Sequence, residues 1–493
     1  MATPPFGSAF GQSPVEVPDS CSIEDFIFDE KYGRHCIQKS LSPFTCGITG
    51  KSRTISEVRH FVSDLAKGLA KRLGWVVPPE NQWERVASMF SQNSIDTLPV
   101  IWAVHRLCGV ISPINTALSA TELAEQLLRS KSKVVFTSRS FLQTAIKACR
   151  VAKIPDSNVM LIAPAGAAKT DMSNHFDSIE DILNAGRNAQ SLTSESLMDR
   201  GNQNHIAFLC FSSGTTGLPV PTIMVNILSN LDLVEKYDLM SSTADIYIGA
   251  APLGPEILNK VEELFPNWKI LQGYGLTEAG PVVSLTPKND IWIGSSGIPL
   301  DGVQCRLISE DGQDIDDWSR PGELLLKSPA LALGYLENEQ ATQQTFIDGW
   351  LHTGDVAVIK QSRRGNYHIF IVDRLKDLLK VKGIQVSPTE LEAHILLHPG
   401  VAEAVVIGVE DARYGEVPMA FVVPTVTNTP GSLPSLASSI KLHVEKHKAN
   451  YKWLRGGVTF LDTLPKTSSG KANRRALRDG ERNRSKNASS SHL

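Results

Sequence analysis

The chain has 493 residues, of which 42% are hydrophobic and 20% charged, and its formal net charge is -3. This length is too great for one compact core and predicts two or three domains. The weak negative charge argues against a general nucleic-acid binder, and no stretch approaches the roughly 20 apolar residues that cross a bilayer. Seven scattered cysteines without a CxxC pair indicate free thiols in a reducing compartment.

Helical patterns and short apolar runs alternate through most of the chain. Residues 56–73 have the apolar spacing of a helix. The runs that predict buried strands are 133–138, 159–163, 205–211, 245–250 and 268–272. This alternation is typical of an α/β fold, with a large multi-layer N-terminal domain of mostly parallel sheets and a smaller C-terminal α/β domain.

A domain boundary is expected near residue 373, because a β-rich region ends there. The following pattern of helix, strand, turn, strand, helix and strand suits a small α/β module of about 100 residues. We therefore expect an N-terminal domain at 1–372 and a smaller C-terminal domain at 373–478. The basic, polar segment 479–493 is expected to be a disordered tail.

The sequence "HIAFLCFSSGTTGLP" is a strand that runs into a loop rich in Ser, Thr and Gly. Consecutive backbone amides and hydroxyls in such a loop form an anion-binding concavity that suits polyphosphate. The residues concerned are Ser212, Ser213, Gly214, Thr215, Thr216 and Gly217. The loop is not a Walker A motif because GK[ST] is missing, and composition alone would favour an ordinary turn.

A second motif, "QGYGLTEAGPV", spans residues 272–282. Tyr274 can stack on a purine, Thr277 can donate to a phosphate oxygen, and Glu278 is a hard oxygen ligand for Mg²⁺. Taken alone, the segment could equally be a loop after a strand.

Three further motifs follow, and each carries one residue of interest. Asp355 in "GWLHTGDVAVI" could accept two hydrogen bonds from a ribose diol, and Arg374 in "DRLKDLLKVKGIQVSP" could hold a ribose or phosphate oxygen. Lys471 in "LPKTSSGKANRRAL" follows a flexible Ser-Ser-Gly and could reach into a site as a point charge. The plainer alternatives are a turn residue for Asp355 and surface charge for the two basic residues.

Together and in this order, the five segments resemble the adenylate-forming superfamily of acyl-CoA synthetases, 4-coumarate–CoA ligases and luciferases. The resemblance runs from about residue 20 to 478. The sequences "VPDSCSIEDFIF" and "GAAPLG" look most like the 4-coumarate–CoA ligase branch. The resemblance implies a ligase that uses ATP, Mg²⁺ and coenzyme A to activate a carboxylic acid as acyl-AMP and pass it to a thiol.

The resemblance also implies roles for residues of the nucleotide site. Tyr274 would pack on adenine near Gly249 and Ala250, and Asp355 with Arg374 would hold the ribose. Catalysis would fall to Thr277 and Lys471 at the phosphate, together with Glu278 as the ligand of Mg²⁺, because these groups neutralise developing negative charge.

The remaining implied roles concern the acyl pocket, the hinge and coenzyme A. Gly275, Pro281 and Val282 would line an apolar pocket for an aromatic or a medium to long aliphatic acid. Lys376 occupies the hinge position about which the small domain would rotate between the half-reactions. Lys382 and Gly383 would border the coenzyme A thiol.

The phosphate loop departs from the family pattern after Pro219. The family continues as Gly-x-Pro-Lys-Gly, whereas here Val220 and Pro221 follow Leu218 and Pro219. A helix, several strands and part of the acyl pocket are therefore expected to be missing between 219 and 221. A sheet without internal strands would expose apolar faces and unpaired edges.

Three functions stay open from the sequence. The first is a working acyl-CoA ligase, the second a non-catalytic remnant or truncated gene model, and the third an adenylating enzyme that loads a carrier protein.

The C-terminal Ser491-His492-Leu493 resembles the Ser-Lys-Leu peroxisomal address, which predicts an import receptor as partner and a peroxisomal rather than cytoplasmic location.

Overall fold

The computed structural model describes residues 23–32, 36, 44–46, 49–75, 81–162, 176–189, 205–211, 231–236, 238–249, 255–382, 384–411, 413–425, 433–466 and 472–490. The chain divides into two compact units, one of residues 14–211 and one built from residue 212 onward. Each unit has its own sheets and apolar cores. Among the described residues, none of the helices combines the length and apolar character that a membrane crossing requires.

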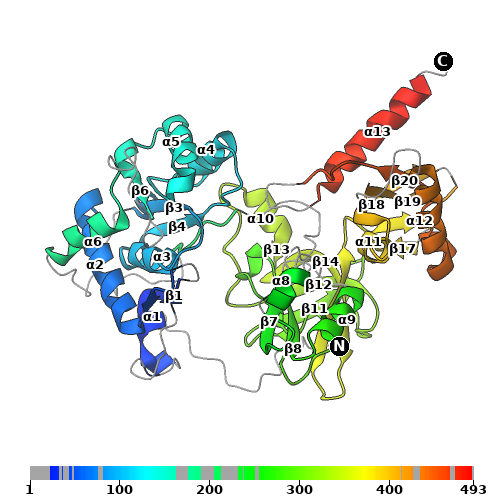
Figure 1. The fold of residues 1–493 in the computed structure, drawn as a ribbon, viewed down its shortest axis with the longest axis horizontal. Coiled ribbons are helices and arrows are strands. Elements are labelled where there is room, and N and C mark those ends of the chain that lie inside the picture. The colour runs from blue at the N-terminus through cyan, green and yellow to red at the C-terminus, as the bar shows by residue number, and fades with distance from the viewer. Residues whose placement is uncertain are drawn as a thin grey trace. The chain divides into compact units, whose positions relative to one another are not determined.

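The first unit is a three-layer α/β sandwich (Figure 1). Its parallel sheet has the strand order β4 (Val110–Pro113), β3 (Val86–Phe90), β5 (Val134–Thr137) and β6 (Val159–Leu161). One core joins this sheet to α2 (Ile55–Leu73), α3 (Thr97–Arg106) and α6 (Ile179–Arg187). A second core joins it to α4 (Ala120–Arg129) and α5 (Leu142–Val151). The remaining elements are α1 (Ile23–Phe28), β1 (Phe44–Thr45) and β2 (Ser52–Arg53).

The prediction of a strand at 205–211 is wrong. Only Phe208 forms a parallel bridge, with Ile111, and the neighbouring residues lie outside any named strand. The segment still follows the sheet edge, because the Ile111 amide donates to the Ala207 carbonyl and the Leu209 amide donates to the Ile111 carbonyl. These bonds are too few for a ladder, although the apolar run is correctly placed beside β4.

The second unit begins with a mixed sheet in the order β10, β9, β8, β7. Its strands are β7 (Ala244–Ile248), β8 (Trp268–Tyr274), β9 (Ser284–Leu285) and β10 (Ile298–Pro299). β7 and β8 are parallel, and α8 (Leu231–Lys236) and α9 (Pro255–Leu264) belong to the same region. The apolar core here gathers the two helices onto β7 and β8. The strands predicted at 245–250 and 268–272 are therefore confirmed.

An antiparallel sheet follows in the second unit. It contains β11 (Gln304–Ile308), β12 (Gly322–Lys327), β13 (Phe346–Ile347), β14 (Trp350–Gln361) and β15 (Tyr367–Arg374), with α10 (Glu339–Thr345) leading into β13. The predicted α/β class is confirmed, and parallel pairing is found in the first unit and between β7 and β8. In this sheet the consecutive strands β11 and β12, β13 and β14, and β14 and β15 pair antiparallel, as hairpin-connected strands do.

The third sheet of this unit comes from residues 379–460. Its strands are β16 (Leu379–Val381), β17 (Ile384–Val386), β18 (Val401–Asp411), β19 (Gly415–Pro424) and β20 (Gly457–Phe460). α11 (Pro388–Ile395) and α12 (Leu433–His447) pack on it through one apolar core, and both lie beside this sheet in Figure 1. The boundary predicted near 373 stays a prediction; residue 373 lies at the end of β15, shortly before β16 begins this separate core.

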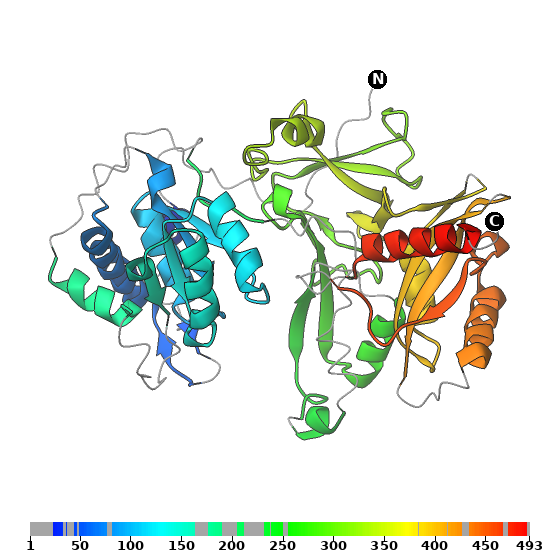
Figure 2. The same cartoon turned by 90° about the horizontal axis from the view of Figure 1, so that it is seen from above.

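The C-terminal segment differs from the expected disordered tail. Residues from Arg474 to Ser490 form helix α13, drawn in red in Figures 1 and 2. Its sequence, RRALRDGERNRSKNASS, has several strong helix formers, and its first two turns are anchored by Leu477 and Arg474, which are both buried. Polarity alone was therefore a poor guide to disorder here.

Two glycines let α2 and α6 approach each other closely in the first unit. A Cβ on Gly68 would lie 2.1 Å from the Ile182 carbonyl oxygen, and a Cβ on Gly186 would lie 1.9 Å from the Asp64 carbonyl oxygen. Neither backbone can move aside easily, because both helices are packed into the same core.

Gly68→Ala is expected to destabilise the first unit by about 1–3 kcal/mol, because the added methyl forces the two helices apart. Thermal unfolding of the full chain measures this change as a lower melting temperature. Gly480→Ala is the matched control, since Gly480 is also helical and a Cβ there meets nothing within 4 Å. Equal melting temperatures for both variants would contradict the prediction.

Candidate active site

Asp355 and Arg374 form the centre of the candidate site. They lie directly opposite each other in the register of β14 and β15. Arg374 Nε lies 3.0 Å from Asp355 Oδ1, and the Asp355 carboxylate is almost fully buried. The motifs "HTGD" and "DRLKD", which are separated in sequence, therefore meet because they are cross-strand neighbours.

Tyr274 brings the second motif to the same place from another sheet. It ends β8, and its hydroxyl donates a 2.6 Å hydrogen bond to Asp355 Oδ2. Because Gln272 pairs with Ile248 on the parallel strand β7, the predicted Gly249 also lies at this end of the sheet. An ideal Cβ on Gly249 would lie 3.5 Å from the Gly273 carbonyl oxygen. Tyr274, Asp355 and Arg374 are thus brought together as the motifs predict.

The electrostatics of this group follow from burial. Burial raises the pKa of the Asp355 carboxyl above its ordinary value, while Arg374 and the Tyr274 hydroxyl act against that rise. Burial and the neighbouring Asp355 carboxylate also raise the pKa of Tyr274, which therefore remains a hydrogen-bond donor. Arg374 and Tyr274 thus help to keep Asp355 ionised, which is the form that accepts hydrogen bonds from two hydroxyls.

The backbone around Asp355 is ordered by residues that the motif search did not single out. Gly354 adopts a φ of 67°, and its amide donates to Glu323 Oε1 at 3.1 Å. The Asp355 amide donates to the Thr353 hydroxyl at 3.0 Å, and that hydroxyl donates to the Leu324 carbonyl at 2.7 Å. Glu323 carries no recognisable motif, so only the structure shows that it supports this turn.

Thr277 and Glu278 lie in a short 3-10 helix, Thr277–Ala279, just after Tyr274. Thr277 is exposed, and Glu278 is half-buried. The Tyr335 hydroxyl donates a 2.8 Å hydrogen bond to Glu278 Oε1, and burial together with this contact raises the pKa of Tyr335 to about 12. The Glu278 carboxylate is a hard oxygen donor held in one orientation, which fits Mg²⁺. Tyr335 was missed because it lies far from every motif.

The residues predicted to line the acyl pocket form one tight loop. A Cβ on Gly275 would lie 1.7 Å from the Pro281 carbonyl oxygen and 2.9 Å from the Val282 Cα. The Val283 amide donates to the Tyr274 carbonyl at 2.9 Å and closes this loop. Val282 is exposed, and the predicted acyl-pocket role of these three residues stays a prediction.

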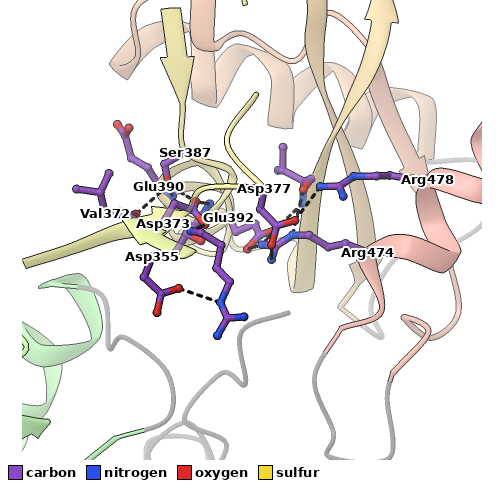
Figure 3. Close-up of polar contacts among 12 residues, drawn as sticks. Asp355, Val372, Asp373, Asp377, Ser387, Glu390, Glu392, Arg474 and Arg478 are labelled. Carbon is purple, nitrogen blue, oxygen red and sulfur yellow. Dashed lines mark hydrogen bonds and ion pairs between the residues drawn. The ribbon is translucent and has the colours of Figure 1, made fainter. Parts of the chain in front are cut away.

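Lys376, at the predicted hinge, is exposed, and two buried aspartates flank it. Asp373 accepts hydrogen bonds from the Ser387 hydroxyl and from the Thr389 amide at the start of α11. Asp377 accepts a 2.9 Å bond from Arg478 in α13. Figure 3 shows both carboxylates reaching from the connecting segment to these helices.

Arg474 anchors the start of α13 in the interior. Its Nη2 donates to both Glu392 oxygens, at 2.6 and 2.7 Å, and only 1% of Arg474 is exposed (Figure 3). Burial raises the pKa of Glu392 to about 7, and the Arg474 charge acts in the opposite direction. Lys466 and Ala472 form an antiparallel bridge just before α13, and these two residues flank the segment that carries Lys471.

Lys382, predicted at the coenzyme A tunnel, lies in a cationic patch around one tyrosine. Its φ is 51°, its amide donates to the Tyr414 carbonyl at 2.8 Å, and its Nζ lies 4.4 Å from the Tyr414 ring centroid. The guanidinium of Arg455 lies 4.8 Å from the same centroid and that of Arg413 lies 5.7 Å away. The patch combines an aromatic face with three positive charges.

Several predicted site residues lie outside the described residues. They are Ser212, Ser213, Gly214, Thr215, Thr216, Gly217, Ala250, Gly383, Lys471 and the C-terminal Ser491-His492-Leu493. Their predicted roles stay predictions.

Ser295, His368 and Asp290 form a line that resembles a hydrolase triad. The Ser295 hydroxyl lies 2.9 Å from His368 Nδ1, and His368 Nε2 lies 3.2 Å from Asp290 Oδ2. However, His368 is 0% exposed and Ser295 is 1% exposed, so no substrate reaches them. These contacts instead hold the segment before β10, which carries Asp290 and Ser295, against His368 in β15.

Comparison with known proteins gives a consistent picture. A family profile described as AMP-binding enzyme matches residues 38–219 and 220–336, and a profile described as AMP-binding enzyme C-terminal domain matches 390–471. The acyl-CoA ligase AKT1 of Alternaria alternata is 34% identical, over 94% of this chain and 95% of its own length. The acyl-CoA ligase frbB of Dothideomycetidae sp. (strain 11243) is 32% identical, over 88% and 92%.

A similar fold is found in a solved structure, the anthranilate CoA ligase AuaEII in complex with anthranoyl-AMP. The two chains superpose with a TM-score of 0.73 and 21% identity, covering 95% of this chain and 99% of the other.

The comparisons also bear on the departure after Pro219. The profile matches in two segments that abut between Pro219 and Val220. The alignment to AKT1 extends over 553 positions, which exceeds the 493 residues of this chain, so part of AKT1 has no counterpart here. The break falls where the sequence predicts a missing segment.

Arg474→Ala is expected to lower the free energy of unfolding by about 3–5 kcal/mol, because it leaves the Glu392 charge buried without a partner. Denaturant or thermal unfolding measures the effect. The control is Arg484→Ala in the same helix, whose only recorded ion pair among the described residues is with Glu481 at 3.4 Å on the surface. We expect that change to stay within about 0.5 kcal/mol, and a comparable loss in the control would contradict the interpretation.

Proposed function

The chain belongs to the family of AMP-binding enzymes, and we infer from this family and from its ligase relatives that it is an ATP-dependent acid–thiol ligase. The proposed reaction has two steps. In the first, a carboxylate oxygen attacks the α-phosphorus of ATP, and pyrophosphate leaves to give acyl-AMP. In the second, the thiol of coenzyme A attacks the acyl carbon, loses its proton and displaces AMP to give the thioester.

The observation that carries this proposal is the convergence of Tyr274, Asp355 and Arg374. Their hydrogen bonds join the end of β8 to the middle of β14 and the end of β15. An ionised Asp355, oriented by a phenol and a guanidinium, suits a vicinal diol such as that of ribose. The neighbouring Tyr274 ring and Gly249 backbone suit a flat base, so this group fits AMP.

The first step needs positive charge, because two anions must approach each other. We propose that Thr277 donates to phosphate, that Glu278 with Tyr335 behind it holds Mg²⁺, and that Lys471 brings its ammonium to the same phosphate. Mg²⁺ would neutralise charge on the phosphate oxygens. Arg474 supports this role indirectly, because it anchors the chain three residues after Lys471.

For the second step we propose that coenzyme A meets the Lys382 and Gly383 turn. The cations around Tyr414 suit the negative charges of coenzyme A, and the ring offers a surface for its adenine.

The acid is proposed to be aromatic or medium to long aliphatic, since Val282 and Pro281 present an apolar surface beside Gly275.

Delivery to peroxisomes through Ser491-His492-Leu493 is also a proposal. The tripeptide keeps a small residue, a titratable base and Leu in the order of the Ser-Lys-Leu address. Imaging an N-terminally fluorescent chain with and without these three residues tests it, and an unchanged distribution would rule it out.

A second candidate function is a catalytically impaired relative of such a ligase. The profile break at 219/220 supports it, and so does β7, the last strand of its sheet among the described residues, where Tyr247 is 53% exposed. An exposed terminal strand is what the loss of neighbouring strands would leave. A third candidate, transfer of the acyl group to a carrier protein, differs only in the second step.

Pyrophosphate exchange into ATP, measured with a panel of carboxylic acids, tests the proposal. Exchange with at least one acid supports the ligase, and mass analysis of the product with coenzyme A separates thioester formation from carrier loading. Folded protein that exchanges with none of the acids would favour the impaired relative.

Tyr335→Phe is expected to weaken the apparent affinity for Mg²⁺ in the exchange reaction by about 10–100-fold, because Glu278 loses the donor that orients it. A Mg²⁺ titration of the exchange rate measures this. Tyr247→Phe, an exposed tyrosine on β7, serves as the control and should leave the titration unchanged. Equal Mg²⁺ dependence in the Tyr335 variant and the wild type would refute the role of Tyr335.

Arg374→Gln is expected to shift the acid limb of ATP binding to higher pH. Arg374 lowers a pKa of Asp355 that burial has raised, so its removal raises that pKa further. The ionised carboxylate is then lost earlier as the pH falls, and ATP affinity decreases with it. Binding isotherms across the acidic range measure the shift, with exposed Arg364→Gln as the control. An acid limb at the same pH in both variants would show that Arg374 does not tune Asp355.

A further inference from the structure

Four histidines gather where α11 meets α12, away from the residues assigned above. His394 lies in the last turn of α11 and His398 follows the helix, while His443 and His447 are one turn apart in α12. One ring nitrogen from each of His394, His443 and His447 lies within 4.8 Å of the other two. His394 is buried, His443 is half-buried and His447 is exposed, so the cluster opens to solvent.

The hydrogen bonds of this cluster fix which ring nitrogens carry protons. His394 Nε2 lies 3.2 Å from the His443 carbonyl oxygen, and His443 Nε2 lies 3.1 Å from the His394 carbonyl oxygen. His447 Nδ1 lies 2.9 Å from the same His443 carbonyl oxygen. A carbonyl oxygen only accepts, so each of these nitrogens must be the N–H of its ring.

The opposite nitrogens therefore carry lone pairs: Nδ1 of His394, Nδ1 of His443 and Nε2 of His447. None of the three has a hydrogen-bond partner among the residues that the structure describes. Metal-binding histidines commonly show this arrangement, with one nitrogen donating to a backbone carbonyl and the other facing the ion.

His398 differs from the other three. Its Nε2 lies 2.9 Å from the Ser439 hydroxyl, and its Nδ1 accepts a 3.1 Å bond from the Gly400 amide. Both nitrogens are thus engaged, and His398 serves the turn after α11 rather than the cluster's open side.

The charges around the cluster tolerate a cation. Lys448 is near enough to oppose protonation of His394, but its ammonium pairs with Glu390 Oε1 at 3.0 Å. Lys452 pairs with the other oxygen of Glu390.

We propose that His394, His443 and His447 form a binding site for a borderline transition-metal ion, with Zn²⁺ as the first candidate. Imidazole suits zinc, copper and nickel, whereas Mg²⁺ and Ca²⁺ prefer oxygen ligands. The site is thus chemically separate from the carboxylate proposed for Mg²⁺. Water would occupy the fourth position of a tetrahedral Zn²⁺.

Binding requires one modest side-chain movement. Zn–N bonds of about 2.0–2.1 Å place tetrahedral ligand nitrogens about 3.3 Å apart. One ring nitrogen of each histidine lies within 4.8 Å of the other two, so the rings must move closer together and turn their lone-pair nitrogens toward the ion. The rings of His394 and His443 are stacked, with centroids 4.3 Å apart and planes 10° apart, and parallel rings cannot both aim at one ion. His443 therefore turns out of the stack when the ion binds, which its half-buried position allows.

The ion would join α11 to α12 by coordination in addition to their apolar contact. Leu391 and Ile395 of α11 already pack with Ile440 and Val444 of α12 in one core. α11 also carries Glu392, the partner of Arg474. A metal ion that holds α11 against α12 would therefore also hold Glu392 in place, and with it the segment that follows Lys471.

Zn²⁺ titration of the full chain tests the site. The protein is freed of metal with a chelator, and Zn²⁺ is added in competition with a chromogenic chelator in the presence of excess Mg²⁺. We expect one Zn²⁺ per chain and a rise in the melting temperature. His447→Ala, at an exposed position, should weaken this binding at least about tenfold and abolish the thermal shift. His443→Ala should do the same.

His60→Ala is the matched control. His60 is also exposed on a helix, and its Nδ1 lies 2.9 Å from the Ser56 carbonyl oxygen, as in His447, but it is not part of the cluster. This variant should bind Zn²⁺ as the wild type does. The proposal is overturned if the wild type binds no Zn²⁺ at micromolar concentrations, or if His447→Ala and His443→Ala bind as tightly as the wild type.

Discussion

The contact between Asp355 and Arg374 is the interaction on which the arrangement of the site depends. It follows from the register of β14 and β15, where the two residues are direct partners. Tyr274 then ties a second sheet to this pair through one hydrogen bond. A slip of one residue in that register would turn these side chains to the other face of the sheet and disperse the site.

The same strand leads directly into the segment that joins the two parts of the second unit. β15 ends at Arg374, and Lys376, the predicted hinge, follows between Asp373 and Asp377. The backbone of Asp373 belongs to the antiparallel sheet, whereas its carboxylate binds the start of α11. The Asp377 carboxylate binds α13. The residues proposed to bind the nucleotide and the connections to the C-terminal sheet are therefore separated by only a few peptide units.

The sequence was informative wherever function is carried by a motif. Tyr274, Asp355 and Arg374 could be predicted to converge because each belongs to a recognisable segment, and the helix at 56–73 followed from its periodicity. Tyr335 and Glu323 could not be predicted, since isolated residues reach the site through tertiary packing. The pair of Glu392 and Arg474, 82 residues apart, and the helix beginning at Arg474 likewise depend on burial that no local pattern reveals.

The contact of Asp373 with α11 bears on how a rotation at Lys376 would proceed. The carboxylate accepts from the first turn of α11 and from its N-cap Ser387, so it complements the positive end of that helix. Swinging the small domain away would break the hydrogen bonds of Asp373 to Ser387 and Thr389, at a net cost of about 1 kcal/mol for each bond. That cost would hold the small domain in one orientation until ligand binding offsets the loss. The two half-reactions would then stay separated in time.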